Sequence, residues 1–157
     1  MAVSATTRAR RTGEAHGEDY YFLTETEFEA AVQDGAFYEH VEYVSGHRYG
    51  TLIREVDRIL GGGSSCVLEL ETQGARAVKE REPRAVTIFI ASPTFDELER
   101  RLTERATESA GEIGERLALA RRQMEEATLF DHIVVNDSVD RAAAAVVAIA
   151  DRELSEQ

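Results

Sequence analysis

The sequence predicts an α/β fold with a doubly wound parallel sheet and a smaller inserted lobe. Short apolar segments at residues 66–70, 86–90 and 132–135 are each followed by a stretch of helical periodicity. This alternation is typical of strand–helix units around a parallel sheet. Residues 86–90 are apolar on both faces, as expected of a strand that is covered on both sides. The segment 22–51 breaks the alternation and is predicted as the inserted lobe.

The first half of the chain combines short strands with capped helices. Aromatic residues within 17–22 favour a short strand or a loop edge. Residues 24–27 read TETE, a capping box, and the helical run behind it ends at the Asp-Gly pair 34–35. A strand is predicted over 37–44, and a helix over 52–60 that ends in three glycines.

The second half of the chain carries the longer helices. Pro93 precedes one of them, and Asn136-Asp137-Ser138 supplies capping side chains before the last. No repeat or low-complexity linker divides the chain, so residues 1–157 are predicted as one domain. The helices are expected at 74–82, from about 95 onwards, at 116–126 and at 142–150.

Composition narrows the class of partner. The 30 acidic and 18 basic residues give a net charge of −12, which disfavours nucleic acid and anionic membranes as partners. Cys66 is the only cysteine, no apolar run is long enough to span a bilayer, and no leader pattern is seen. A cytoplasmic location is therefore expected, and the sequence does not indicate the oligomeric state. The four histidines lack metal-ligand spacing.

Several polar side chains suggest a nucleotide pocket. Arg8 and Arg11, with hydroxyls nearby, could hold a phosphate dianion, because an arginine fork binds phosphate at two points. Carboxylates could accept from the N–H groups of guanine. Each residue taken singly is also explained by a solvated surface charge. The candidate tyrosines, carboxylates and hydroxyl are Tyr20, Tyr49, Glu39, Glu69, Glu71 and Thr51.

The order and spacing of these residues resemble the guanylate kinase family. Residues 4–22 follow the pattern SATTR-x-x-R-x-GE-x-x-G-x-DY-x-F. The likeness continues through LELETQGARAV, IFIASPTFDELERRLTERATES, RLALARRQMEEA and FDHIVVND, so it covers nearly the whole chain. The resemblance implies the fold of P-loop nucleoside monophosphate kinases, with a GMP-binding lobe at about 22–51 and a lid at about 103–120.

The resemblance also implies residue roles. Transfer of the γ-phosphoryl group of ATP to GMP, with Mg²⁺ arriving on ATP and no dedicated protein metal site, is the implied reaction. Asn136 matches the adenine-side loop, and the implied catalytic arginines of the helix and lid are Arg101, Arg105 and Arg116. The implied GMP phosphate ligands are Ser4, Arg8, Arg11, Tyr20 and Tyr49. The implied guanine-side residues are Glu39, Thr51, Glu69 and Glu71.

The chain departs from the family pattern in one large respect. The family places a strand, a glycine-rich P-loop and a helix before the SATTR motif, and that βα unit is missing here. Residues 61–65 are glycine-rich but lack the lysine of a P-loop. We therefore expect a late-start or truncated guanylate kinase that is inactive alone; the alternative is a non-catalytic GMP-binding, anion-binding or protein-interaction module. Smaller departures are Glu71, Ser92, Ala106 and Gln123.

Overall fold

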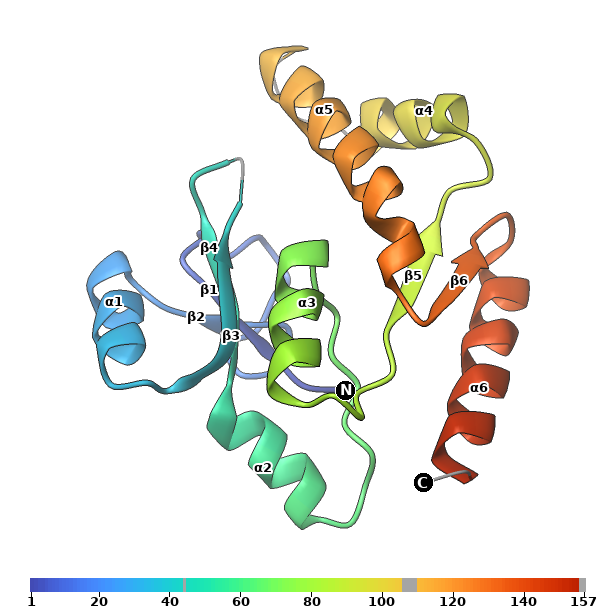
Figure 1. The fold of residues 1–157 in the computed structure, drawn as a ribbon. Coiled ribbons are helices and arrows are strands. Elements are labelled where there is room, and N and C mark those ends of the chain that lie inside the picture. The colour runs from blue at the N-terminus through green and yellow to red at the C-terminus, as the bar shows by residue number, and fades with distance from the viewer. Residues whose placement is uncertain (44, 106–109, 156–157) are drawn as a thin grey trace. The chain divides into compact units, whose positions relative to one another are not determined.

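The chain divides into two compact units, Met1–Pro83 and Arg84–Gln157. A computed structural model describes residues 1–43, 45–105 and 110–155, except for the side chains of residues 105 and 110–112. Within that part of the chain no helix is long and apolar enough to cross a membrane. Each unit is built of strands and helices (Figure 1).

The first unit contains a four-stranded mixed sheet in the order β2-β1-β4-β3. β1 runs parallel to β2 and antiparallel to β4, and β4 runs antiparallel to β3. Figure 1 shows α1 and α3 on opposite sides of this sheet. The elements are β1 (Ser4–Thr6), β2 (Tyr21–Phe22), α1 (Glu25–Gln33), β3 (Phe37–Glu42), β4 (Arg48–Leu52), α2 (Ile53–Gly61) and α3 (Thr72–Arg81).

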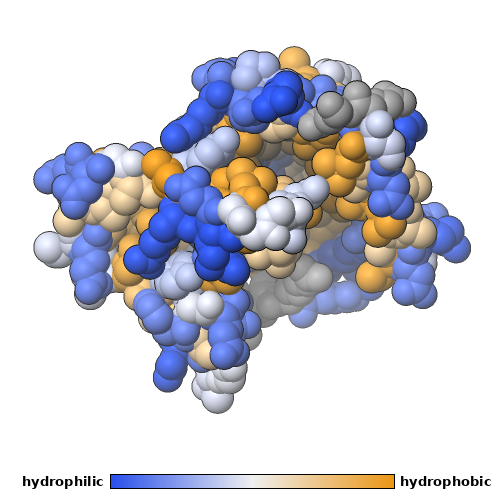
Figure 2. Space-filling view, turned by 90° about the horizontal axis from the view of Figure 1, so that it is seen from below, coloured by the Kyte–Doolittle hydropathy of each residue, from blue (hydrophilic) through white to orange (hydrophobic). Residues whose placement is uncertain are grey.

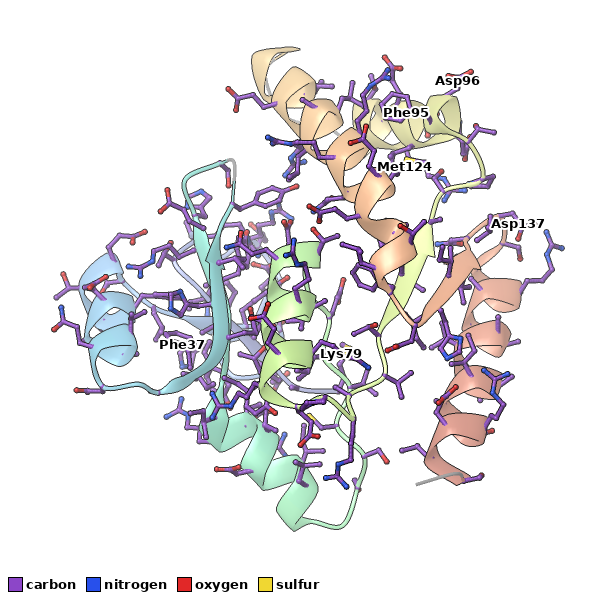
Figure 3. The ribbon with its side chains drawn as sticks, viewed as in Figure 1. Phe37, Lys79, Phe95, Asp96, Met124 and Asp137 are labelled. Atoms are coloured by element: carbon purple, nitrogen blue, oxygen red, sulfur yellow. The ribbon has the colours of Figure 1, made fainter. Side chains whose placement is uncertain are left out.

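Helix α1 begins at the predicted capping box and covers the core of this unit. The Thr24 hydroxyl accepts from the Glu27 amide, and the Glu27 carboxylate accepts from the Thr24 amide. Phe28 is fully buried, and its ring stacks on that of Phe37 with centroids 4.4 Å apart. Figure 3 shows Phe37 on the α1 side of the sheet. The core therefore lies between α1 and the sheet, and includes Ala5 and Leu52.

The second unit contains two parallel strands, β5 (Ile88–Ala91) and β6 (His132–Val135). The Asp131 carboxylate accepts from the backbone amide of Thr87, which ties the starts of the two strands together. The Arg121 guanidinium lies 3.9 Å from the centre of the Phe95 ring. The helices of this unit are α4 (Phe95–Arg105), α5 (Ala110–Glu126), a 3₁₀ turn (Ala127–Leu129) and α6 (Val139–Ser155).

The predicted α/β composition is confirmed, with differences in detail. Residues 66–70 are not a strand: the Val67 carbonyl accepts from the Ala2 amide, but the segment joins no described ladder. A strand needs a hydrogen-bonded neighbour along its length, and apolar sequence alone does not supply one. The helix expected at 142–150 begins at Val139 and ends at Ser155. The doubly wound arrangement of the sheet stays a prediction, as do the lobe and lid bounds. Val44 and residues 106–109 of the predicted lid, Ala106 included, lie outside the described residues.

Charged and polar side chains dominate the projecting parts of the surface seen in Figure 2. This agrees with a composition in which 31% of residues are charged. Apolar atoms still reach the surface between them, as they do in most folded proteins.

Candidate functional site

Three predicted guanine and phosphate contacts lie in one row across the first sheet. Ser4 of β1 pairs with Thr51 of β4, and Thr51 pairs with Glu39 of β3. Residues directly opposite each other on neighbouring strands project from the same face of a sheet. Two hydroxyls and a carboxylate therefore line one face, over a width of about 10 Å given by two interstrand spacings.

A β-bulge places the carboxylate of Glu39. The register between β3 and β4 shifts between Phe37 and Glu39, and an irregularity of this kind leaves a backbone group without its ladder partner. The Thr51 amide donates instead to Oε1 of Glu39 at 2.9 Å. Glu39 is only 6% exposed, and this burial raises the pKa of its carboxyl, while the hydrogen bonds from Thr51 oppose the rise.

Gly74 of α3 lies behind the same carboxylate. A Cβ atom at residue 74 would be 2.7 Å from Oε2 of Glu39, closer than real Cβ contacts come. A side chain at residue 74 would therefore force the Glu39 carboxylate to shift from this position. The glycine of the LELETQGARAV motif is thus explained by the structure.

Arg8 is held by a carboxylate and by aromatic rings. Its Nη2 and Nη1 donate to Glu14 at 2.7 and 3.1 Å, and its guanidinium carbon lies 5.3 Å from the ring centre of Tyr20 and 5.7 Å from that of Phe22. The hydrogen bond to Glu14 is the main reason that the pKa of Arg8 is raised, and Tyr49 contributes to the same rise. The guanidinium is thus pre-oriented by Glu14 with the Tyr49 hydroxyl nearby.

Tyr20 and Tyr49 meet edge to face with ring centroids 6.2 Å apart. Burial raises the pKa of the Tyr20 hydroxyl, and the neighbouring Tyr49 and Glu69 raise it further. The structure therefore brings Tyr20 and Tyr49 close to Arg8, and Glu69 close to Tyr20. Arg11 has an exposed side chain, and its backbone amide donates to Glu14 at 2.7 Å.

The two carboxylates of the LELETQ segment differ in position. Glu69 is exposed in the extended segment that precedes α3. Glu71 is half-buried and is the N-terminal capping residue of α3, with extended backbone angles and no capping hydrogen bond from its side chain. The Glu71 carboxylate is therefore not used to cap the helix.

The second unit brings together two of the residues predicted to serve ATP, Arg101 and Asn136. Arg101 of α4 donates from Nε to Glu97 at 2.7 Å and from Nη1 to the backbone carbonyl of Asn136 at 3.0 Å. The Asn136 amide donates to the Ala91 carbonyl at 2.7 Å. Arg100 and, second, Arg101 lower the pKa of Glu97 to about 2. Helix α4 is thus tied to the segment between β6 and α6.

Three further residues that the family resemblance singles out lie in this unit. Arg116 is half-buried on α5, and the side chain of Arg105 lies outside the described residues. Ser92, which replaces a family proline, has a buried Oγ that finds no hydrogen-bond partner in the part of the chain that the structure describes. A proline at that position would leave no such hydroxyl.

The prediction from sequence missed Glu14 and Gly74 as residues that shape the site, and it missed the burial of Glu55. Glu14 and Gly74 stand inside the quoted motifs, so the motifs themselves were the available signal. Glu55 carried no signal, because an acidic residue in the first turn of a helix is ordinary. Its burial is known only from the structure.

No group of three or more metal-binding side chains is found in residues 1–43, 45–105 and 110–155. The prediction that Mg²⁺ arrives with ATP is not tested by this structure and stays a prediction.

Comparison with known proteins shows the family of the chain. The family model for guanylate kinase matches residues 1–153. The guanylate kinase of Frankia casuarinae is 47% identical over 149 residues, which are 95% of this chain and 80% of that protein. That of Rubrobacter xylanophilus is 46% identical over 148 residues, which are 94% and 77% of the two chains. The crystal structure of guanylate kinase from Anaplasma phagocytophilum superposes with a TM-score of 0.83 at 31% identity, covering 97% of this chain and 74% of that chain.

The fold and the family model together define a mixed α/β protein of the nucleotide kinase class. The chain belongs to the guanylate kinase family, and the predicted membership of an enzyme family is confirmed.

Proposed function

We propose that this chain forms the GMP-binding part of a guanylate kinase that transfers the γ-phosphoryl group of ATP to GMP. One observation carries the proposal: Ser4, Thr51 and Glu39 share a row on one sheet face. That row supplies both hydroxyls and a carboxylate to one ligand. Curated relatives bear the name guanylate kinase, which supports the same reaction.

The guanine base is the part of GMP that Glu39 would recognise. Guanine presents N–H donors where adenine presents none in the same places, and an ionised carboxylate is an acceptor only. Oε1 of Glu39 already accepts from the Thr51 amide, which orients the carboxylate before any ligand arrives. A base lacking those donors would displace water from the buried carboxylate without giving it a hydrogen bond in return, and that is costly.

The phosphate group of GMP would be held beside Arg8. Its guanidinium is oriented by Glu14 and by two aromatic rings, so little side-chain freedom is lost when phosphate binds. Ser4, Tyr20, Tyr49 and Arg11 complete the proposed set. Glu69, Glu71 and Thr51 stay proposed residues of the guanine side.

Phosphoryl transfer needs positioning and charge neutralisation more than covalent help from the protein. We propose that Arg101, Arg105 and Arg116 serve the triphosphate and that Asn136 serves the adenine side, with Mg²⁺ carried on ATP. The hydrogen bond from Arg101 to the Asn136 carbonyl supports the proposal that these two residues both serve ATP. We expect a cytoplasmic setting for this reaction.

The 157 residues contain no G-x-x-x-x-G-K-[ST] sequence. They therefore hold no P-loop that could bind the β-phosphate of ATP. We therefore propose that these residues alone bind GMP and turn over slowly or not at all. The same observation favours a second candidate, a GMP-binding module without catalysis.

Calorimetry with GMP, followed by a coupled assay for ADP release with ATP and Mg²⁺, tests the proposal. Arg8→Ala should weaken GMP binding by about tenfold to a hundredfold, since hydrogen bonds to charged groups are worth roughly 1.5–3 kcal/mol. Arg10→Ala, which removes an exposed arginine of the same loop, is the matched control. Absence of GMP binding by the parent chain would overturn the proposal. Turnover would show that these residues suffice for catalysis and would exclude the binding module.

A further inference from the structure

Glu55 is a buried carboxylate that none of the proposed roles uses. It lies in the first turn of α2, and its side chain is 2% exposed. Oε1 accepts from the Val3 amide at 3.2 Å and from Nη2 of Arg58 at 2.6 Å. Oε2 accepts from the Tyr21 hydroxyl at 3.2 Å and from Nε of Arg58 at 3.1 Å. Each oxygen thus has two donors, as a buried carboxylate requires.

Two of these donors adjoin residues of the proposed GMP phosphate site. Val3 immediately precedes Ser4, and Tyr21 immediately follows Tyr20. β1 and β2 also pair directly, with Ala5 opposite Tyr21. Glu55 therefore joins α2 to both strands at the points where the chain enters the phosphate site.

The position of Glu55 relative to the sheet separates it from the ligand face. Ala5 and Tyr21 belong to the core side of the sheet or pack against it, whereas neighbouring residues along a strand project to the opposite face. Ser4 therefore projects away from the core side, and Glu55 can reach the site only through the backbone of Val3 and the hydroxyl of Tyr21.

We propose that Glu55 is a positioning residue of the GMP phosphate site, which it serves by fixing the chain at Val3 and Tyr21. The inference rests on the proposed binding of GMP. Glu55 itself would touch no part of the nucleotide. Its effect arises because a binding site loses affinity when its ligands are displaced by about 1 Å.

Two variants loosen this support in different ways, and GMP affinity by calorimetry is the first readout. Glu55→Gln removes the charge that holds Arg58 and should weaken GMP binding about tenfold. Tyr21→Phe removes one hydroxyl, keeps the ring, and should weaken it about threefold. Two matched controls change residues of the same kinds elsewhere. Glu29→Gln removes the charge of an ion-paired carboxylate on α1, and Tyr38→Phe removes the hydroxyl of a tyrosine that packs against Arg81. Both variants should bind GMP as the parent does.

A double-mutant cycle with Ser4→Ala separates positioning from a general loss of stability. If Glu55 acts through Ser4, the two substitutions together should cost less affinity than the product of their separate fold-changes. Independent effects, or an affinity equal to that of the parent in both the Glu55 and the Tyr21 variants, would overturn the inference.

The outcomes are distinguishable from failure of the proposed function. If the parent chain does not bind GMP, the proposed function fails and this inference falls with it. If the parent binds and both support variants bind equally well, only the role of Glu55 is wrong. Should Glu55→Gln fail to fold, Tyr21→Phe and its cycle with Ser4→Ala decide the question alone.

Discussion

Gly74 and Glu39 touch across the interface between α3 and β3: a Cβ at residue 74 would lie 2.7 Å from Oε2 of Glu39. The glycine thus leaves the space in which the carboxylate sits. This relationship joins the helix after the LELETQ segment to the residue that we propose recognises guanine.

Gly74→Ala should weaken GMP binding without unfolding the protein. The carboxylate of Glu39 must shift to admit the new methyl group, while alanine favours a helix over glycine by about 1 kcal/mol. We expect GMP affinity to fall about tenfold, the cost of one displaced charged hydrogen bond. Gly61→Ala, where a Cβ would meet open space, is the control. Equal GMP affinity in both variants, measured by calorimetry, would contradict the contact.

Stability should depend on pH through Glu39. Burial raises the pKa of this carboxyl, so the folded state holds the proton more tightly than the unfolded state. This contribution to stability is present below the unfolded pKa and is lost as pH rises through the folded pKa. Urea unfolding of the parent and of Glu39→Gln between pH 4 and 7 measures it, since glutamine at residue 39 does not titrate while the other groups are shared. We expect the variant to gain stability relative to the parent as pH rises; a constant difference would show that the pKa is not raised.

GMP affinity should also depend on the ionisation of Glu39. It should rise with pH, whereas the contribution of Glu39 to stability falls. In the proposed site the ionised carboxylate would accept hydrogen bonds from the N–H groups of guanine, whereas the protonated form presents a donor. We therefore expect GMP to bind more weakly as pH falls through the raised pKa of Glu39. Calorimetry across that range should show this decline in the parent, while Glu39→Gln should discriminate GMP from AMP poorly at every pH.

Glu97 should titrate with a pKa of about 2, because Arg100 and Arg101 both donate to its carboxylate. For an acid whose folded pKa is lowered, the stabilising effect is present above the unfolded pKa and is lost as pH falls through the folded pKa. Carboxyl carbon NMR locates the midpoint. Arg100→Gln should move the midpoint upward, since Arg100 is the larger cause. An unchanged midpoint in that variant would show that the ion pair does not persist in solution.

Thr24→Ala should destabilise the protein through the cap of α1. Loss of the hydroxyl that accepts from the Glu27 amide should lower the free energy of unfolding by about 1 kcal/mol. Thr26→Ala removes an exposed threonine from the first turn of the same helix and should cost much less. Urea unfolding compares the two, and equal losses would mean that the cap contributes nothing specific.

The sequence predicted local structure well where short-range chemistry decides it. The capping box at residues 24–27 is present with both of its hydrogen bonds, and α1 ends where the Asp-Gly pair predicted. The prediction failed at residues 66–70, where a short apolar segment suggested a strand and no described ladder forms. Whether such a segment becomes a strand depends on a neighbouring chain that lies elsewhere in the sequence.

Much of the candidate site could also be predicted, but only as a set of residue names. The motifs indicated Ser4, Arg8, Glu39 and Thr51 without showing which of them meet. They did not show that Glu14 holds Arg8 at two points.

The sequence by itself determined the family, the helix caps and the residues offered to a nucleotide, because motifs and caps depend on residues a few positions apart. Only the tertiary structure decided that Ser4, Thr51 and Glu39 form one row, that Gly74 makes room for a carboxylate, and that Glu55 is buried against Val3. Strand register and burial bring together residues as far apart as 52 positions in the sequence. A pattern of neighbouring residues cannot show which distant residues will meet.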